Sequence, residues 1–410
     1  MQKTQQQARW YWTSIALFVL AGCAVSVFIQ LKFEQALAAG IAITDVSALA
    51  RSLYLVENYA NLVYIKRFDL CGLLALYAPG YLLSSWFYPV INGALLVTAS
   101  LFYKKLFIDD AAMTGSFPVA VLGIVGNPYL LLTFPGPNKE LPLLALTLAL
   151  CWLMLRKPSG WLVYSIMAAL LAAAFRDGYG ALLLLLVVVF TAAERTPRPH
   201  VVALLASVAL CAATVTLMHP LSEWLSFLHR NITVASTFSG QVPQVKPGIS
   251  SSSVTVALLS LTDWLRRSVL NVVSLAIFPG IQQTNGQIYW LGIGYWLFGV
   301  ANLFAFLAAA YTVLKTFLAR NAPQSGRMAV FWIAAWLMIS ASLYVQPRYM
   351  MTMLPIGIGL LSTLPLRTRI VFCALVVALV VTKITLALAA GASLPLITPD
   401  TFPVNPYLLP

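Results

Sequence analysis

Residues 138–140 place asparagine, lysine and glutamate directly after a Pro-Gly-Pro turn and before a long apolar run. The prolines end one helix, and Asn138 is placed to cap the next one. The first amides of that helix, together with Lys139, would then form an anion site. Glu140 is a candidate general base. The segment predicts phosphate binding beside a proton acceptor, and the alternative is a capped loop with solvated charges.

A second charged segment, Arg176-Asp177-Gly178-Tyr179-Gly180, separates two very apolar runs. The glycines allow a tight reversal of the chain. Asp177 either neutralises Arg176 or orients the guanidinium toward a phosphate. Tyr179 could stack on a sugar.

The third segment is Gln346-Pro347-Arg348-Tyr349, where proline interrupts an apolar run. A broken helix is tolerated in a membrane beside a polar cavity. Arg348 has the planar fork that binds phosphate through two hydrogen bonds, and Tyr349 could contact a sugar. The alternative is an arginine that snorkels to the interface beside an aromatic-belt tyrosine. Arg230 is a weaker candidate of the same kind.

An amphipathic helix is expected at residues 45–64, because apolar residues recur there at spacings of three and four. Asp45 either caps this helix or faces a cavity at membrane level as a second candidate base, with Arg51 beside it.

The elements that must position these residues are membrane helices. Of 410 residues, 60% are hydrophobic and 9% are charged, with a mean hydropathy of +0.86. A soluble protein carries about 25% charged residues, so the soluble classes are excluded. The net charge of +13 points to basic loops on the inner side of a membrane and to anionic lipid or substrate phosphate, and not to nucleic acid.

The pattern predicts an all-α, polytopic chain with a single transmembrane domain, residues 1–410, about eleven spans, an inner N-terminus and an outer C-terminus. Outer segments are expected at residues 32–80 and 219–287, and a proline-rich outer tail at 391–410. An interfacial helix is expected near 254–278; the alternative is a span there, which would reverse all later helices but would place Arg266 and Arg267 inside the membrane. The cysteines and histidines show no metal-ligand spacing, so we expect no metal and no cofactor. The spans are predicted at residues 10–31, 81–101, 113–134, 141–155, 161–175, 181–193, 201–217, 288–314, 328–345, 350–364 and 370–390.

These segments together resemble the bacterial polysaccharide polymerases of the Wzy and EpsG type, on Asp45, the Gly136–Glu140 motif, the Arg176 turn and Arg348-Tyr349. The resemblance implies a GT-C-like integral membrane glycosyltransferase in the bacterial inner membrane. It implies transfer of a glycan from undecaprenyl diphosphate to a lipid-linked acceptor at the periplasmic face, without a metal. It also admits a chain-length regulator protein as a partner.

Two other functions remain open at this point. A GT-C transferase that uses a polyprenyl-phosphate sugar would be expected to need a metal and a pair of acids. A flippase or transporter of lipid-linked glycans would be expected to carry basic residues inside its helices and internal repeats.

Overall fold

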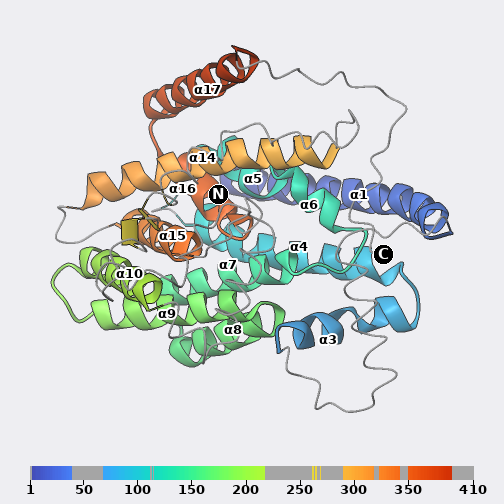
Figure 1. Ribbon diagram of the computed structural model, residues 1–410, viewed down its shortest axis with the longest axis horizontal. Helices are drawn as coiled ribbons and strands as arrows, with labels where there is room; N and C mark the ends of the chain where they lie inside the picture. Colours follow the sequence, from blue (N-terminus) through green and yellow to red (C-terminus); the bar gives the residue numbers. More distant parts are fainter. Residues whose placement is uncertain are drawn as a thin grey trace, which may run out of the picture.

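The computed structural model of the chain describes residues 2–38, 68–110, 113, 115–217, 261–262, 264–265, 268, 290–317, 323–341 and 350–389. Every element in these ranges is a helix, which confirms the all-helical prediction. Most of the helices run side by side (Figure 1). They are α1 (Gln2–Ala38), α3 (Phe68–Leu82), α4 (Phe87–Phe107), α5 (Phe117–Val125), α6 (Pro128–Thr133), α7 (Glu140–Arg156), α8 (Trp161–Phe175), α9 (Asp177–Ala193), α10 (Pro199–Thr216), α14 (Trp290–Thr316), α15 (Gln324–Ala341), α16 (Leu354–Thr363) and α17 (Leu366–Ala389).

One prediction about the elements was wrong. The helix expected at 113–134 is two helices, α5 and α6, because Pro128 begins a new helix after the Gly126-Asn127 break. Within the outer segment expected at 32–80, the apolar run after Asp69 forms a further helix, α3, which packs on α8 and α4. The helix expected at 45–64 and the tail at 391–410 lie outside the described residues.

Four of the described helices are long and apolar enough to cross a membrane: Gln5–Val27, Phe87–Phe107, Pro199–Thr216 and Leu297–Thr316. Shorter apolar helices accompany them, and some carry apolar side chains on their outer surface. Val163 and Met167 of α8 are 60% and 52% exposed, and Val377 of α17 is 60% exposed. Apolar surface of this kind is suited to lipid contact, so the chain has the helices of a membrane protein.

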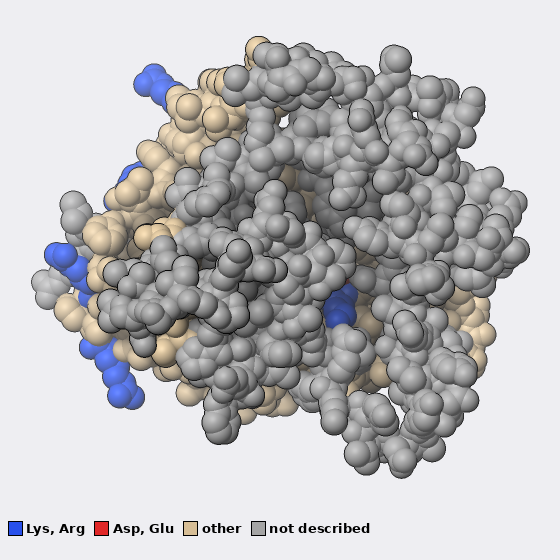
Figure 2. Space-filling view, viewed as in Figure 1, with Lys and Arg blue, Asp and Glu red and all other residues tan. Residues whose placement is uncertain are grey.

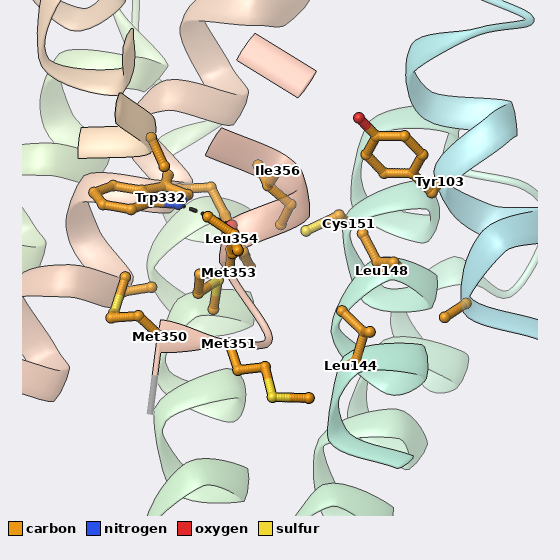
Figure 3. Close-up of a cluster of buried hydrophobic side chains, with 14 of the residues drawn as sticks. Tyr103, Leu144, Leu148, Cys151, Trp332, Met350, Met351, Met353, Leu354 and Ile356 are labelled. Atoms are coloured by element: carbon orange, nitrogen blue, oxygen red, sulfur yellow. Dashed lines mark hydrogen bonds between the residues drawn. The ribbon is translucent and has the colours of Figure 1, made fainter. Parts of the chain in front are cut away.

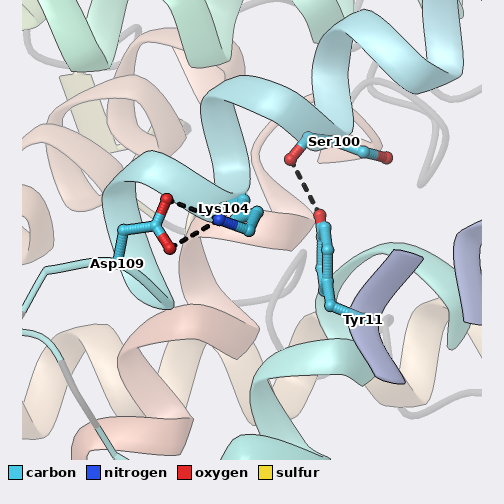
Figure 4. A network of polar contacts seen from close by, with 4 residues as sticks. All are labelled: Tyr11, Ser100, Lys104 and Asp109. Carbon is cyan, nitrogen blue, oxygen red and sulfur yellow. Dashed lines mark hydrogen bonds and ion pairs between the residues drawn. The ribbon is translucent and has the colours of Figure 1, made fainter. Parts of the chain in front are cut away.

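The basic segments of the chain come together at one end of the bundle, which we call the basic end. Contacts between successive connections define it: Arg156 pairs with Asp110 at 2.9 Å, Lys157 pairs with Glu194, and His200 Nε2 lies 3.1 Å from the Thr316 carbonyl oxygen. Ion pairing between Lys104 and Asp109 lies at the same end, near the hydrogen bond from the Tyr11 hydroxyl to the Ser100 carbonyl (Figure 4). Lysine and arginine side chains project along the left margin of the space-filling view (Figure 2).

The core places residues 350–356 between α15 and α7 (Figure 3). The Trp332 indole donates a 2.9 Å hydrogen bond to the Met353 carbonyl, which fixes the irregular turn before α16. Leu144 and Leu148 of α7 line the other side of this cluster, and both are fully buried. The segment that follows Arg348 and Tyr349 in the sequence therefore lies in the core, between α15 and α7.

Candidate functional site

The turn between α6 and α7 lies at the end of the bundle opposite the basic end, and a buried asparagine of α4 holds it. Asn92 Nδ2 lies 3.0, 3.0 and 2.9 Å from the carbonyl oxygens of Thr133, Phe134 and Gly136. Its Oδ1 accepts a 2.6 Å hydrogen bond from the Tyr77 hydroxyl of α3. Asn92 thus joins α3, α4 and the end of α6 to the Pro-Gly-Pro turn. Its amide satisfies carbonyls that a proline-rich turn leaves without helical partners.

Asn138 caps α7, as the sequence predicts. Its Oδ1 accepts the Leu141 amide at 2.9 Å, and its Nδ2 donates to Asn92 Oδ1 and the Thr133 carbonyl, both at 3.0 Å. The side chain is 5% exposed. In this conformation the Asn138 amide is occupied by the protein and has no hydrogen bond left for a phosphate.

The first amides of α7 are largely occupied as well. The Lys139 amide donates to Glu140 Oε2 at 3.1 Å, and the Leu143 amide donates to the Lys139 carbonyl at 3.2 Å. Pro142 has no amide hydrogen. Protein oxygens thus accept the Lys139, Leu141 and Leu143 amides, which leaves few amides of this helix for the expected anion site, and the Lys139 side chain is the cation beside it.

Glu140 and Lys139 differ in accessibility. The Glu140 side chain is 4% exposed, and its Oε2 accepts the Lys139 amide of the turn, whereas the Lys139 side chain is partly exposed. As a base, Glu140 would need a substrate hydroxyl that reaches into the turn.

Arg176 lies at the sharp junction between α8 and α9, on the same end of the bundle as the Asn138 turn. The junction residue is extended, with φ −158° and ψ 105°, and its carbonyl accepts the amides of Tyr179 and Gly180 at 3.0 Å. A Cβ at Gly180 would lie 2.4 Å from the Ala173 backbone nitrogen, so glycine is needed for this close approach of the two helices. The Arg176 side chain is partly exposed.

Tyr179 joins α7, α9 and the segment before α16. Its hydroxyl lies 2.9 Å from Thr147 Oγ1 and 2.5 Å from Thr352 Oγ1. The side chain is 5% exposed. In this conformation the ring presents no free face to a sugar, so the proposed stacking would require the three elements to separate.

The structure therefore brings Asn138, Lys139, Glu140, Arg176 and Tyr179 to one end of the bundle. Asp45, Arg51, Arg230, Arg348 and Tyr349 lie outside the described residues, as does the side chain of Asp177. Sequence reasoning missed the residues that hold the site: Tyr77, Asn92, Thr147 and Thr352. Asn92 gave a usable signal, since an amide within an apolar membrane helix requires a partner.

Within the described residues, no group of three or more histidine, cysteine, aspartate or glutamate side chains is placed to hold a metal ion. Comparison of the chain with protein-family models, with curated proteins and with solved structures gives no match. The fold and the charge distribution thus define the class, an all-helical membrane protein with one basic end and a smaller polar site at the opposite end.

Replacing Tyr179 with phenylalanine tests whether its hydroxyl holds α7, α9 and the segment before α16 together. The change removes the hydroxyl shared by Thr147 and Thr352 and keeps the ring, so we expect a loss of about 1–3 kcal/mol in unfolding free energy. Thermal unfolding in detergent measures this loss. Unchanged stability would show that the hydroxyl contacts contribute nothing.

Proposed function

We propose that this chain joins oligosaccharide repeat units carried on undecaprenyl diphosphate, at the periplasmic face of the bacterial inner membrane. The observation that carries the proposal is the placement of the Asn138–Glu140 turn and the Arg176 junction at one end of the bundle, opposite the basic end. A phosphate-binding cation and a carboxylate are the groups that transfer from a lipid diphosphate requires.

The proposed reaction makes one bond and breaks one. An acceptor hydroxyl attacks the anomeric carbon of the donor glycan, and the bond from that carbon to the diphosphate oxygen breaks. The hydroxyl proton passes to Glu140, or to Asp45 as the second candidate. The departing lipid diphosphate gains negative charge, which Lys139, Arg176 and Arg348 would stabilise.

Arg348 is included in the proposal because of its neighbours in the sequence. It precedes Thr352 by four residues, and the Thr352 hydroxyl contacts the hydroxyl of Tyr179, which follows Arg176 by three residues. Four residues of chain span at most about 14 Å, which limits how far Arg348 can lie from Thr352.

The direct test supplies the purified chain, reconstituted in lipid, with lipid-diphosphate-linked repeat units and separates the products by length. Oligomers on lipid support the proposal. Growth only from a polyprenyl-phosphate sugar would indicate the GT-C alternative. Movement of the lipid-linked glycan across the bilayer without a new glycosidic bond would indicate a flippase.

The proposed topology has about eleven spans, with the N-terminus inside and the C-terminus outside. Single cysteines introduced at Ser250 and Gln324 should then react with a membrane-impermeant reagent from opposite sides of the membrane. Reaction of both positions from the same side would contradict the topology.

We also expect the reaction to be independent of divalent metal, because the sequence shows no carboxylate or histidine cluster beside its outer arginines. Turnover on lipid-linked repeat units should persist in EDTA. Loss of turnover that Mg²⁺ or Mn²⁺ restores would overturn this expectation and make Asp45 a candidate ligand.

A further inference from the structure

The charges at the basic end are divided unevenly between the two halves of the chain. In the first half, Asp109 pairs with Lys104, Asp110 with Arg156 and Glu194 with Lys157. The second half contains no aspartate or glutamate between Asp263 and Asp400. Its cations at this end therefore have no carboxylate of their own helices to neutralise them.

Four cations of the second half, together with Arg198 of the first half, form what we call the unpaired basic cluster, because no ion pair joins them to a carboxylate among the described residues. Lys315 lies in the last turn of α14, Arg327 lies in the first turn of α15, and Arg198 immediately precedes α10. Arg367 and Arg369 lie in the first turn of α17. Arg198, Lys315, Arg327 and Arg367 are exposed, and Arg369 is partly buried.

Contacts between the helices bring together the helix ends that carry these cations. His200 of α10 touches the Thr316 carbonyl of α14 at 3.1 Å, beside Arg198 and Lys315. The rings of Tyr311 and Phe372, whose centroids are 5.9 Å apart, join the end of α14 to the start of α17. Helix α15 packs on both α10 and α14.

Two buried polar atoms at this place have unused hydrogen-bonding capacity. His200 is 2% exposed, and neither its Nδ1 nor Arg369 Nε has a hydrogen-bond partner. Helices α10, α15 and α17 also begin at this end, so the positive ends of three helix dipoles add to the side-chain charges. Unpaired cations, helix N-termini and unused polar atoms together favour an anion.

We propose that the unpaired basic cluster binds the headgroup of an anionic phospholipid. Orientation by positive inner loops requires cations on this side of the membrane, but it does not require that the carboxylates paired at this end, Asp109, Asp110 and Glu194, all lie in the first half of the chain. A cluster of basic residues between membrane helices at the headgroup level is the kind of site that lipid phosphates occupy. Apolar side chains exposed on α17, such as Ile370 at 58% and Val371 at 56%, lie directly beyond the cluster and would contact the acyl chains.

The test uses the purified full-length chain in detergent and measures retained lipid by native mass spectrometry, together with the thermal unfolding midpoint. The probes are dioleoyl phosphatidylglycerol, dioleoyl phosphatidylcholine and inorganic phosphate. We expect phosphatidylglycerol alone to be retained and to raise the midpoint. Its affinity should fall as NaCl is raised from about 0.05 to 0.5 M, because salt screens exposed charges.

A matched pair of double variants locates the site. Lys315→Gln with Arg367→Gln should weaken phosphatidylglycerol binding by about thirty-fold, given the usual contribution of each basic residue at a membrane surface. The control, Arg9→Gln with Lys105→Gln, removes two exposed cations from the other half of the same end and should change binding by less than about threefold.

Three results would overturn the proposal. Equal loss in both double variants would show a diffuse attraction to the whole end. Equal retention of phosphatidylcholine would show that the cluster does not distinguish an anionic headgroup from a zwitterionic one. A phosphate effect matching that of phosphatidylglycerol would show a site for a free anion and not for lipid. The wild-type salt series and lipid comparison decide the question even if a variant does not fold.

Discussion

If the chain is the polymerase proposed above, replacing Arg348 with lysine is expected to slow polymerisation by roughly ten- to a hundred-fold, with the protein inserted at its normal level. Arginine binds a diphosphate through two parallel hydrogen bonds from a planar group, and an ammonium reproduces the charge but not the fork. One charge-assisted contact contributes about 1.5–3 kcal/mol, and tenfold in rate corresponds to about 1.4 kcal/mol. Alanine should therefore be worse than lysine.

The measurement is the length distribution of the polymer made by equal amounts of membrane-inserted protein. Arg9→Lys is the matched control, since Arg9 is an exposed arginine of α1 at the basic end and should tolerate the same change. If Arg348 only anchors the chain at the interface, lysine would serve equally well. Polymer of wild-type length and amount from Arg348→Lys would rule out the diphosphate clamp.

Much of the helical layout follows from the sequence, because apolar runs bounded by charged or proline-containing segments allow little else in a membrane. The runs predicted at 141–155 and 161–175 are α7 and α8 with at most one residue added at each end. The basic connections also group as their charges predict, since Arg156, Lys157 and the start of α10 lie at one end. Hydropathy alone did not separate α5 from α6, because both halves of that run are apolar and only the Gly126-Asn127-Pro128 break divides them.

The candidate site was predicted less completely, because spacing along the chain does not reveal which partners a polar side chain meets. The Asn138 cap is a local feature and was predicted correctly. The use of the same asparagine in a network with Asn92, 46 residues away, depends on how α4 packs against the turn. Tyr179 was assigned to sugar binding from its neighbours, whereas its hydroxyl lies between two threonines of other elements.

Replacing Asn92 with alanine should give the largest loss of stability among polar substitutions near the site. The change removes the donor to the Phe134 carbonyl and the acceptor of the Tyr77 hydroxyl, and both partners are buried. A buried polar group left without a partner costs about 1–3 kcal/mol, so we expect a loss of about 2–6 kcal/mol in unfolding free energy. Because the turn carries Lys139 and Glu140, activity per folded molecule should fall as well.

Two further variants make the Asn92 prediction specific. Thr98→Ala, on the same helix, removes an exposed hydroxyl that bonds only to the Ala94 carbonyl of its own helix, and it should change stability by less than about 0.5 kcal/mol. Asn92→Asp keeps the shape and the acceptor for Tyr77 but turns an oxygen toward the carbonyls of Thr133, Phe134 and Gly136. Three carbonyl oxygens would then face a carboxylate oxygen with no donor between them, so this variant should unfold at least as readily as Asn92→Ala. A thermal midpoint equal to that of the parent would show that Asn92 does not hold the turn.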